Sequence, residues 1–320
     1  MEKTMGYSAI SIELTKRCNL LCRYCYAGTE QGSRAFIDYE RLCGFLESFV
    51  GSGGRKVLLT GGELFLHDRV LDIIKYASRL GLIVDIFTNG TLVTDAHIDV
   101  IGKRVNQVFL SLDGPQSVQD RLSGTPGSFD RVRETAVKFA GSGVATNLQS
   151  MIVPENLNDF GWLLDILGSV DIRTVVLSHV SRMGKGTEVP ELLLDDGQML
   201  HLLRRSAELM KCSGYKTRIV TNIVTSDMRR VFYGDFVDFI HPWMMPDGTI
   251  YTCYNTSLGY WKLSDYVRYP AVEPYAADRL RCLNERLVEQ TEHMPFFDLF
   301  QMIHVVSEDM AREGDAHDGV

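Results

Sequence analysis

The 320-residue sequence lacks several features that would each point to a particular class of protein. No apolar run is long enough to cross a membrane, and the first fourteen residues lack the apolar centre of a signal peptide. Basic residues are not in excess: the formal net charge is −8, so no nucleic-acid partner is expected. Seven cysteines in a chain of this length do not make the disulfide framework of a secreted protein. We therefore expect a cytoplasmic protein with no membrane or nucleic-acid partner.

Short apolar segments alternate with amphipathic segments over the first two thirds of the chain. Strands are predicted at 8–15, 56–63, 82–90, 106–114, 146–153 and 173–180. The helices that follow them are predicted at 38–50, 69–81, 94–104, 128–142, 157–168 and near 195–213. Six consecutive strand–helix units imply parallel strands with right-handed crossovers. The expected fold is α/β, a partial (β/α)6 barrel of the TIM type.

The alternation fails after about residue 225. The segment "IHPWMMPDGTIYTCYNTSLGYWKLSDY" (240–266) predicts a β-hairpin whose turn contains Pro246, Asp247 and Gly248. We expect a barrel domain over 1–225 and a smaller domain over 226–320, which ends in a frayed, charged tail.

Three cysteines lie close together in "RCNLLCRYCYAG" (17–28), namely Cys18, Cys22 and Cys25. Three thiolates can hold three irons of a 4Fe–4S cluster and leave the fourth iron open to another ligand. Structural zinc is an alternative, but it needs four ligands and no second cysteine pair lies nearby. A disulfide would use two of the three thiols and leave one unpaired. The spacing favours the iron–sulfur cluster.

Polar residues and glycines recur where the predicted strands end. In a parallel barrel, catalytic residues gather at this end of the strands, so their recurrence predicts a site there. These residues are Thr60, Gly61, Gly62 and Glu63, then Thr88, Asn89 and Gly90, then Ser111, Asp113 and Gly114, then Ser178 and His179.

Taken together, these motifs resemble those of the radical S-adenosylmethionine (SAM) enzymes. The CxxxCxxC at 18–25 looks like the signature of that superfamily, and "GGELFLH" (61–67) resembles its Gly-Gly-Glu motif. The segments "TNGTLVT" (88–94) and "LSLDGPQSVQDRLSGTPGSFD" (110–130) are similar to the branch with a C-terminal SPASM or twitch domain. The resemblance extends over roughly residues 8 to 260, so it implies that the smaller domain is SPASM/twitch-like.

The resemblance implies a role for each matching residue. Cys18, Cys22 and Cys25 would ligate the cluster, whose open iron would bind the amino and carboxylate groups of SAM. Tyr24 would lie near the adenine, and Glu63 would accept a hydrogen bond from the ammonium. Other cofactor-binding residues would approach the methionyl part or lie towards the ribose and the barrel mouth: Gly61, Gly62, Thr88, Asn89, Ser111 and Asp113.

The sequence departs from the family pattern in places. Leu64 stands where proline is usual, and Ser123 stands where a basic residue is expected. The C-terminal region has too few cysteines for a full SPASM domain. A second iron–sulfur cluster would have to use Cys212, Cys253 and Cys282, and burial as isolated thiols is the simpler interpretation.

The implied function is hydrogen abstraction by a 5′-deoxyadenosyl radical, with a peptide or a small sugar or nucleoside as substrate, in natural-product biosynthesis or peptide maturation. A flavodoxin or ferredoxin-type protein would donate the electron. The alternatives are a non-catalytic iron–sulfur sensor and a maturase of another enzyme. His179 is a candidate substrate contact, and Cys253 a candidate hydrogen donor in a redox-neutral reaction. We expect His67 and His97 to be solvated or to cap helices.

Overall fold

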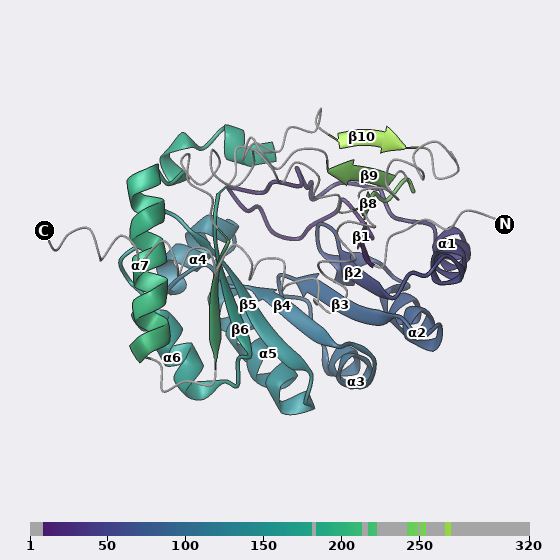
Figure 1. Cartoon of the computed structure of the whole chain (residues 1–320), viewed down its shortest axis with the longest axis horizontal. Helices are drawn as coiled ribbons and strands as arrows, with labels where there is room; N and C mark the ends of the chain where they lie inside the picture. Colours follow the sequence, from purple (N-terminus) through teal and green to yellow (C-terminus); the bar gives the residue numbers. More distant parts are fainter. Residues whose placement is uncertain are drawn as a thin grey trace, which may run out of the picture.

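The computed structural model describes residues 9–180, 184–212, 217–222, 242–248, 250–253 and 266–269. Seven of its strands are parallel and lie in the sheet in the order of the sequence (Figure 1). They are β1 (Ala9–Glu13), β2 (Lys56–Thr60), β3 (Ile83–Thr88), β4 (Gln107–Ser111), β5 (Ala145–Ile152), β6 (Thr174–His179) and β7 (Arg218–Asn222). The expected partial TIM-type barrel is confirmed.

Helices connect the strands, and Figure 1 shows α1, α2, α3 and α5 side by side along one face of the sheet. The helices are α1 (Tyr39–Gly51), α2 (Val70–Arg79), α3 (Asp95–Arg104), α4 (Gln116–Ser123), α5 (Ser128–Ser142), α6 (Gly161–Ser169) and α7 (Asp196–Cys212). Short 3-10 turns are η1 (Leu64–Leu66), η2 (Gly184–Thr187) and η3 (Pro190–Leu192). Within the described residues, no helix is both long and apolar enough to cross a membrane.

Successive residues of each strand point to opposite faces of the sheet, and the two faces differ in composition. Val57 and Leu59 of β2 are fully buried in the main hydrophobic core beneath the helices, as are Val108 and Leu110 of β4. The intervening residues point to the inner face, which is rich in polar side chains; they include Ser11, Glu13, Lys56, Asp85, Gln107, Ser111, Asn147, Gln149 and Ser178. The main hydrophobic core therefore lies between the sheet and the helices, and many polar side chains lie on the opposite, inner face of the sheet.

The predicted hairpin is confirmed, and it joins the same sheet. Strand β8 (Pro242–Met244) pairs antiparallel with β9 (Ile250–Cys253), which pairs with β10 (Tyr266–Tyr269). Strand β8 also runs parallel to β1, with Ser11 opposite Trp243. The hairpin thus continues the barrel sheet beyond its first strand, while the domain boundary near residue 225 stays a prediction.

Two elements go beyond the six predicted units. Strand β7 pairs parallel with β6 and adds a seventh strand to the barrel. Helix α4 follows β4 directly, before the predicted helix that is observed as α5. Both elements are short, and α4 supports the candidate site described below.

Candidate functional site

The cysteine loop leaves the carboxyl end of β1 and carries three free thiols. Cys18 is buried, whereas Cys22 and Cys25 are half-buried. The Cys18 sulfur accepts hydrogen bonds from the Leu20 amide at 3.5 Å and from the Asn89 side chain at 3.8 Å. Burial raises the pKa of Cys18 to about 11 and the pKa of Cys22 well above its ordinary value. The loop thus presents three thiols from one short segment at the catalytic end of the barrel.

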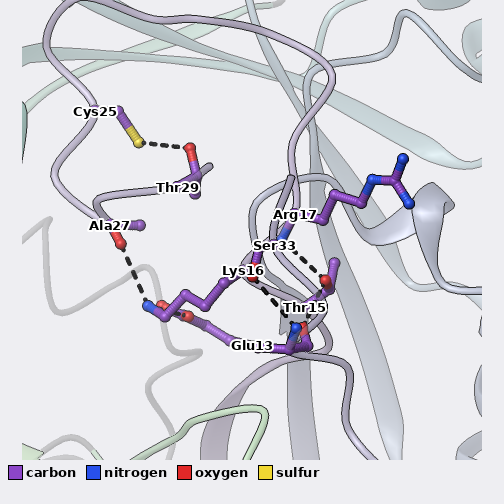
Figure 2. Close-up of polar contacts among 9 residues, drawn as sticks. Glu13, Thr15, Lys16, Arg17, Cys25, Ala27, Thr29 and Ser33 are labelled. Atoms are coloured by element: carbon purple, nitrogen blue, oxygen red, sulfur yellow. Dashed lines mark hydrogen bonds and ion pairs between the residues drawn. The ribbon is translucent and has the colours of Figure 1, made fainter. Parts of the chain in front are cut away.

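Polar contacts with residues at and just after the end of β1 stabilise the second half of the cysteine loop. Lys16 places its ammonium 2.6 Å from a Glu13 carboxylate oxygen and donates to the Ala27 carbonyl at 3.3 Å, as Figure 2 shows. In the same view, the sulfur of Cys25 lies 3.2 Å from the hydroxyl of Thr29. These contacts with Glu13, Lys16 and Thr29 therefore stabilise the conformation of the loop around Cys25.

Helix α4 and the loop after β6 support the cysteine loop from two further directions. The amides of Leu21 and Arg23 donate to the carbonyl oxygens of Ser123 and Leu122, both at 2.9 Å. The Lys185 amide donates to the Cys25 carbonyl at 2.9 Å. The loop after β6 therefore contacts the cysteine loop through η2. The sequence analysis did not predict α4, whose last carbonyl groups accept these two hydrogen bonds from the cysteine loop.

The Gly-Gly-Glu loop after β2 packs directly against the cysteine loop. The Gly62 amide donates to the Thr15 carbonyl at 2.7 Å, and the Glu63 amide donates to the Arg17 carbonyl at 2.8 Å. Gly61 has φ of +151°, and a Cβ on Gly62 would lie 2.1 Å from the Arg17 carbonyl oxygen. Only glycine permits this approach. The structure thus requires both glycines for loop packing, and their proximity to SAM stays a prediction.

Glu63 is buried at the centre of these loops. Its carboxylate accepts from the Thr88 hydroxyl at 2.8 Å, the Asn89 amide at 2.8 Å and the Phe65 amide at 3.2 Å. Burial raises the pKa of Glu63 to about 7, although these hydrogen bonds favour the ionised form. In the described part of the chain, no lysine or arginine pairs with this carboxyl group.

Asn89 joins the predicted cluster ligands to Glu63. Its backbone amide donates to Glu63, while its side-chain amide donates to the Cys18 sulfur and, at 3.0 Å, to the Asn19 side chain. The end of β3 therefore brings residues from three separate motifs into one hydrogen-bonded group, as their positions at neighbouring strand ends predict.

The end of β4 contacts the cysteine loop through Asp113. The Tyr24 hydroxyl donates to one oxygen of this buried carboxylate, and the Met151 amide donates to the other at 2.9 Å. Burial raises the pKa of Asp113 to about 6. Ser111 is half-buried on the inner face at the end of the same strand. Tyr24 and Asp113 are thus in contact, whereas their contacts with a cofactor stay predictions.

The inner face also carries residues that sequence reasoning did not select. Gln149 of β5 donates its side-chain amide to the Ser178 hydroxyl at 2.5 Å. Ser111 lies opposite Gln149 in the β4–β5 register. The signal was available, because Gln149 is a polar residue that alternates with the core residues Leu148 and Ile152 along β5, so it lies on the inward face.

The remaining predicted residues are placed only in part. His179 is half-buried at the end of β6. Cys253 ends β9 and Cys212 ends α7, but their side chains lie outside the described residues, as does all of Cys282. A second cluster formed by these cysteines, and a position of Cys253 at the barrel mouth, therefore stay predictions.

The three thiols of the cysteine loop fit a cluster better than a single ion. Among the described residues, no three His, Cys, Asp or Glu side chains are grouped as ligands of one metal ion. In a cubic cluster each thiolate binds a different iron, so the sulfurs need not converge on one point. The donor set, three thiols beside a buried carboxyl group without a cationic partner, suits a 4Fe–4S cluster with SAM.

Comparison with protein families gives a match that extends from β1 to α6. Residues 12–167 match the model of the Radical SAM superfamily. Fe-coproporphyrin III synthase of Methanosarcina barkeri is 28% identical over 224 residues, which cover 65% of this chain and 53% of that protein. The sporulation killing factor maturation protein SkfB of Bacillus subtilis is 24% identical over 199 residues, which cover 62% and 48%. The chain spans about half the length of these curated relatives.

Solved structures share the fold. Streptococcus suis SuiB bound to S-adenosylmethionine aligns with a TM-score of 0.65 at 16% identity, over 76% of this chain and 59% of that chain. Native anSMEcpe with bound AdoMet aligns with a TM-score of 0.64 at 16% identity, over 81% and 76%. The similarity extends beyond the part of the chain that matches the family model.

Proposed function

We propose that this chain, a member of the radical SAM superfamily through residues 12–167, cleaves SAM reductively and abstracts hydrogen from a substrate carbon. The observation that carries the proposal is the position of Asn89, which contacts both Cys18 and Glu63. A cluster on the cysteine loop would therefore lie beside the buried carboxyl group.

Each part of the site has a separate task in this proposal. The 4Fe–4S cluster, when bound, would supply the low-potential electron that breaks a carbon–sulfur bond of SAM and gives methionine and a 5′-deoxyadenosyl radical. Cys18, Cys22 and Cys25 would hold it, and Glu63 would bind the ammonium of SAM. The strands and loops around them would exclude water, which protects a reactive species from side reactions. An external flavodoxin or ferredoxin-type protein would provide the electron.

We favour a peptide as substrate over an anionic tetrapyrrole. The names of relatives include both classes, and SuiB has been solved bound to a precursor peptide. Support for a peptide comes from the neutral hydrogen-bonding groups of Ser111, Gln149 and Ser178, which suit amides. The inner-face lysine Lys56 is already paired with Asp85, at 2.6 Å. A short precursor peptide encoded beside this gene would support the proposal, and a set of haem-biosynthesis genes would contradict it.

The first test is iron binding and SAM cleavage. Anaerobic reconstitution should give about four irons per chain, and replacing Cys18, Cys22 and Cys25 together by alanine should remove nearly all of them. Cys43→Ala is the matched control, because Cys43 is a buried thiol on α1. With dithionite and SAM, the wild type should release 5′-deoxyadenosine slowly even without substrate, and the triple variant should release none.

Two outcomes would change the proposal. A protein that holds four irons but releases no 5′-deoxyadenosine would contradict catalysis and favour an iron–sulfur sensor. About eight irons per chain would indicate a second cluster that uses Cys212, Cys253 and Cys282.

Cys253 and His179 have proposed roles toward the substrate. In a redox-neutral reaction such as epimerisation, His179 would contact the substrate. Cys253 would donate a hydrogen atom to the substrate radical and become a thiyl radical, which an electron from the external donor and a proton would restore to the thiol. With the substrate in deuterium oxide, the product should carry solvent deuterium, and Cys253→Ala should abolish that labelling. A product two hydrogens lighter than the substrate would rule out the redox-neutral outcome.

A further inference from the structure

Asp113 has every polar group of its side chain and backbone engaged by the chain itself. One carboxylate oxygen accepts from the Tyr24 hydroxyl and the other from the Met151 amide. Its backbone amide donates to the Gln119 side chain at 2.7 Å, and its carbonyl accepts from the Asn156 side-chain amide. The residue thus lies where the cysteine loop, β4, β5 and α4 meet.

These contacts differ from the role that family resemblance implies for Asp113. Each oxygen of this carboxylate already accepts a hydrogen bond from a donor of the chain, so these contacts assign it a partner within the protein. Tyr24, in contrast, lies between Cys22 and Cys25 in the cysteine loop. A change at Asp113 would therefore reach the site through the tyrosine.

We propose that Asp113 is a positioning residue that fixes the ring of Tyr24, and through it the adenine side of the SAM site. The inference rests on the proposed function for its consequence, since SAM must bind beside Tyr24. Tyr24 has two rotatable side-chain angles, and its hydroxyl is the group farthest from the backbone. A hydrogen bond to a carboxylate at that point restricts the ring to one orientation before any ligand arrives.

The geometry around Tyr24 supports this assignment. The Arg23 amide donates to the Leu122 carbonyl, so the backbone beside Tyr24 is tied to α4. The Asp113 carboxylate is tied to β5 by Met151. Backbone and hydroxyl are thus fixed by two different elements, and the ring spans the distance between them.

A double-mutant cycle tests the inference. Tyr24→Phe keeps the ring and removes only the hydroxyl, whereas Asp113→Asn removes the carboxylate charge and one of its two accepting oxygens. Each single variant should raise the Kd for SAM about tenfold, the size expected for a hydrogen bond to a charged group. Because both changes break the same contact, the Kd for SAM of the double variant should also rise about tenfold rather than about a hundredfold.

The assay should separate positioning from a general loss of structure. We expect the KM for SAM in the uncoupled reaction to rise while kcat and bound iron stay near wild type. Asp85→Asn is the matched control: Asp85 is also a buried inner-face carboxylate, but it lies at the opposite end of the strands and pairs with Lys56. It should not change the Kd for SAM.

A second readout needs neither cluster nor SAM. In the metal-free protein, amide hydrogen exchange over residues 20–26 should be faster in Tyr24→Phe and in Asp113→Asn than in the wild type or Asp85→Asn. If Asp113→Asn does not fold, Tyr24→Phe still gives both measurements, because it leaves Asp113 in place.

The outcomes are distinguishable. A hundredfold loss in the double variant would show that Asp113 acts independently of Tyr24 and would overturn the inference. Wild-type affinity and wild-type exchange in Tyr24→Phe would overturn it as well. A wild type that never cleaves SAM would contradict the proposed function, whereas the exchange measurement would still test whether Asp113 fixes Tyr24.

Discussion

Two buried carboxyl groups at the carboxyl end of the strands, Glu63 and Asp113, have different partners from Asp85 at the amino end. At the amino end of the strands, the Asp85 carboxylate lies 2.6 Å from the Lys56 ammonium and also accepts from the side chains of Asn106 and Gln107, at 2.9 and 2.7 Å. A cation and two amides thus compensate this buried charge, as a folded core requires. The charge of Asp85 is therefore compensated by groups of the protein, without a ligand.

At the carboxyl end, Glu63 and Asp113 receive hydrogen bonds from neutral donors only, within the described residues. Burial accordingly raises the pKa of Glu63 to about 7 and that of Asp113 to about 6. A buried carboxyl group without a counter-ion costs stability, and such groups occur most often at functional sites. Glu63 is therefore the group whose charge a cationic ligand would compensate under the proposed function, and SAM carries both an ammonium and a sulfonium.

The largest loss of stability is expected when the ion pair at the amino end of the strands is broken. Lys56→Ala would leave Asp85 buried without its cation, which typically costs about 3–5 kcal/mol of unfolding free energy. Urea denaturation of the metal-free protein measures this cost. The exposed Lys103→Ala is the control and should change stability by less than about 0.5 kcal/mol. A similarly small change for Lys56→Ala would show that the ion pair is not a structural requirement.

A smaller loss should follow from a change in loop packing at the carboxyl end. The new Cβ of Gly62→Ala would overlap the Arg17 carbonyl oxygen and force the two loops apart, at a cost of about 2–3 kcal/mol. The site should also bind less iron, which colorimetric iron analysis would detect. Gly32→Ala is the control, because a Cβ there meets no atom within 4 Å. Full iron binding by Gly62→Ala would mean that the contact between the loops is dispensable.

The smallest expected effect concerns the charge of Glu63. Its raised pKa means that the carboxyl group is partly protonated near pH 7, and a cationic ligand binds the ionised form. SAM affinity should therefore be highest above pH 7 and fall as the pH is lowered through 7. Glu63→Gln should bind SAM about tenfold more weakly at pH 8, a difference of about 1.4 kcal/mol. Equilibrium dialysis across this range measures both profiles.

The control for this experiment is Glu134→Gln, an exposed change on α5 that should keep the wild-type profile. If Glu63→Gln followed the wild-type profile, the pH dependence would belong to another group, and the assignment of Glu63 to the ammonium would be wrong.

The sequence predicted most of the barrel because its strands are marked by alternating apolar residues. The prediction failed where elements are short. Strand β7 has five residues with polar ones at both ends, and its pairing with β6 identifies it. Helix α4 has eight mostly polar residues, so its packing against the cysteine loop decides its conformation. His97 caps α3 and His67 is the C-cap residue of η1, so both occupy capping positions as one of the two predicted alternatives states, and His67 is buried.

The candidate site was predicted as a set of residue types, and the structure supplied their partners. Glu63 and Asn89 are 26 residues apart, and Tyr24 and Asp113 are 89 residues apart. Such contacts depend on strand register and loop direction, which no local pattern contains. The glycines illustrate the difference: the family resemblance implied a close approach to the methionyl part of SAM, and the group that approaches Gly62 in the structure is the backbone of Arg17.

The pairing of β8 with β1 has a consequence for synthesis on the ribosome. Strand β1 is synthesised more than two hundred residues before its partner on one side, with Ser11 opposite Trp243. Until that segment is made, the first strand has an unsatisfied edge that can pair with another nascent chain. A chain cut at the predicted boundary near residue 225 would keep that edge permanently. We therefore expect the isolated barrel to aggregate, and the hairpin to act as the closing strand for the segment that holds the cysteines.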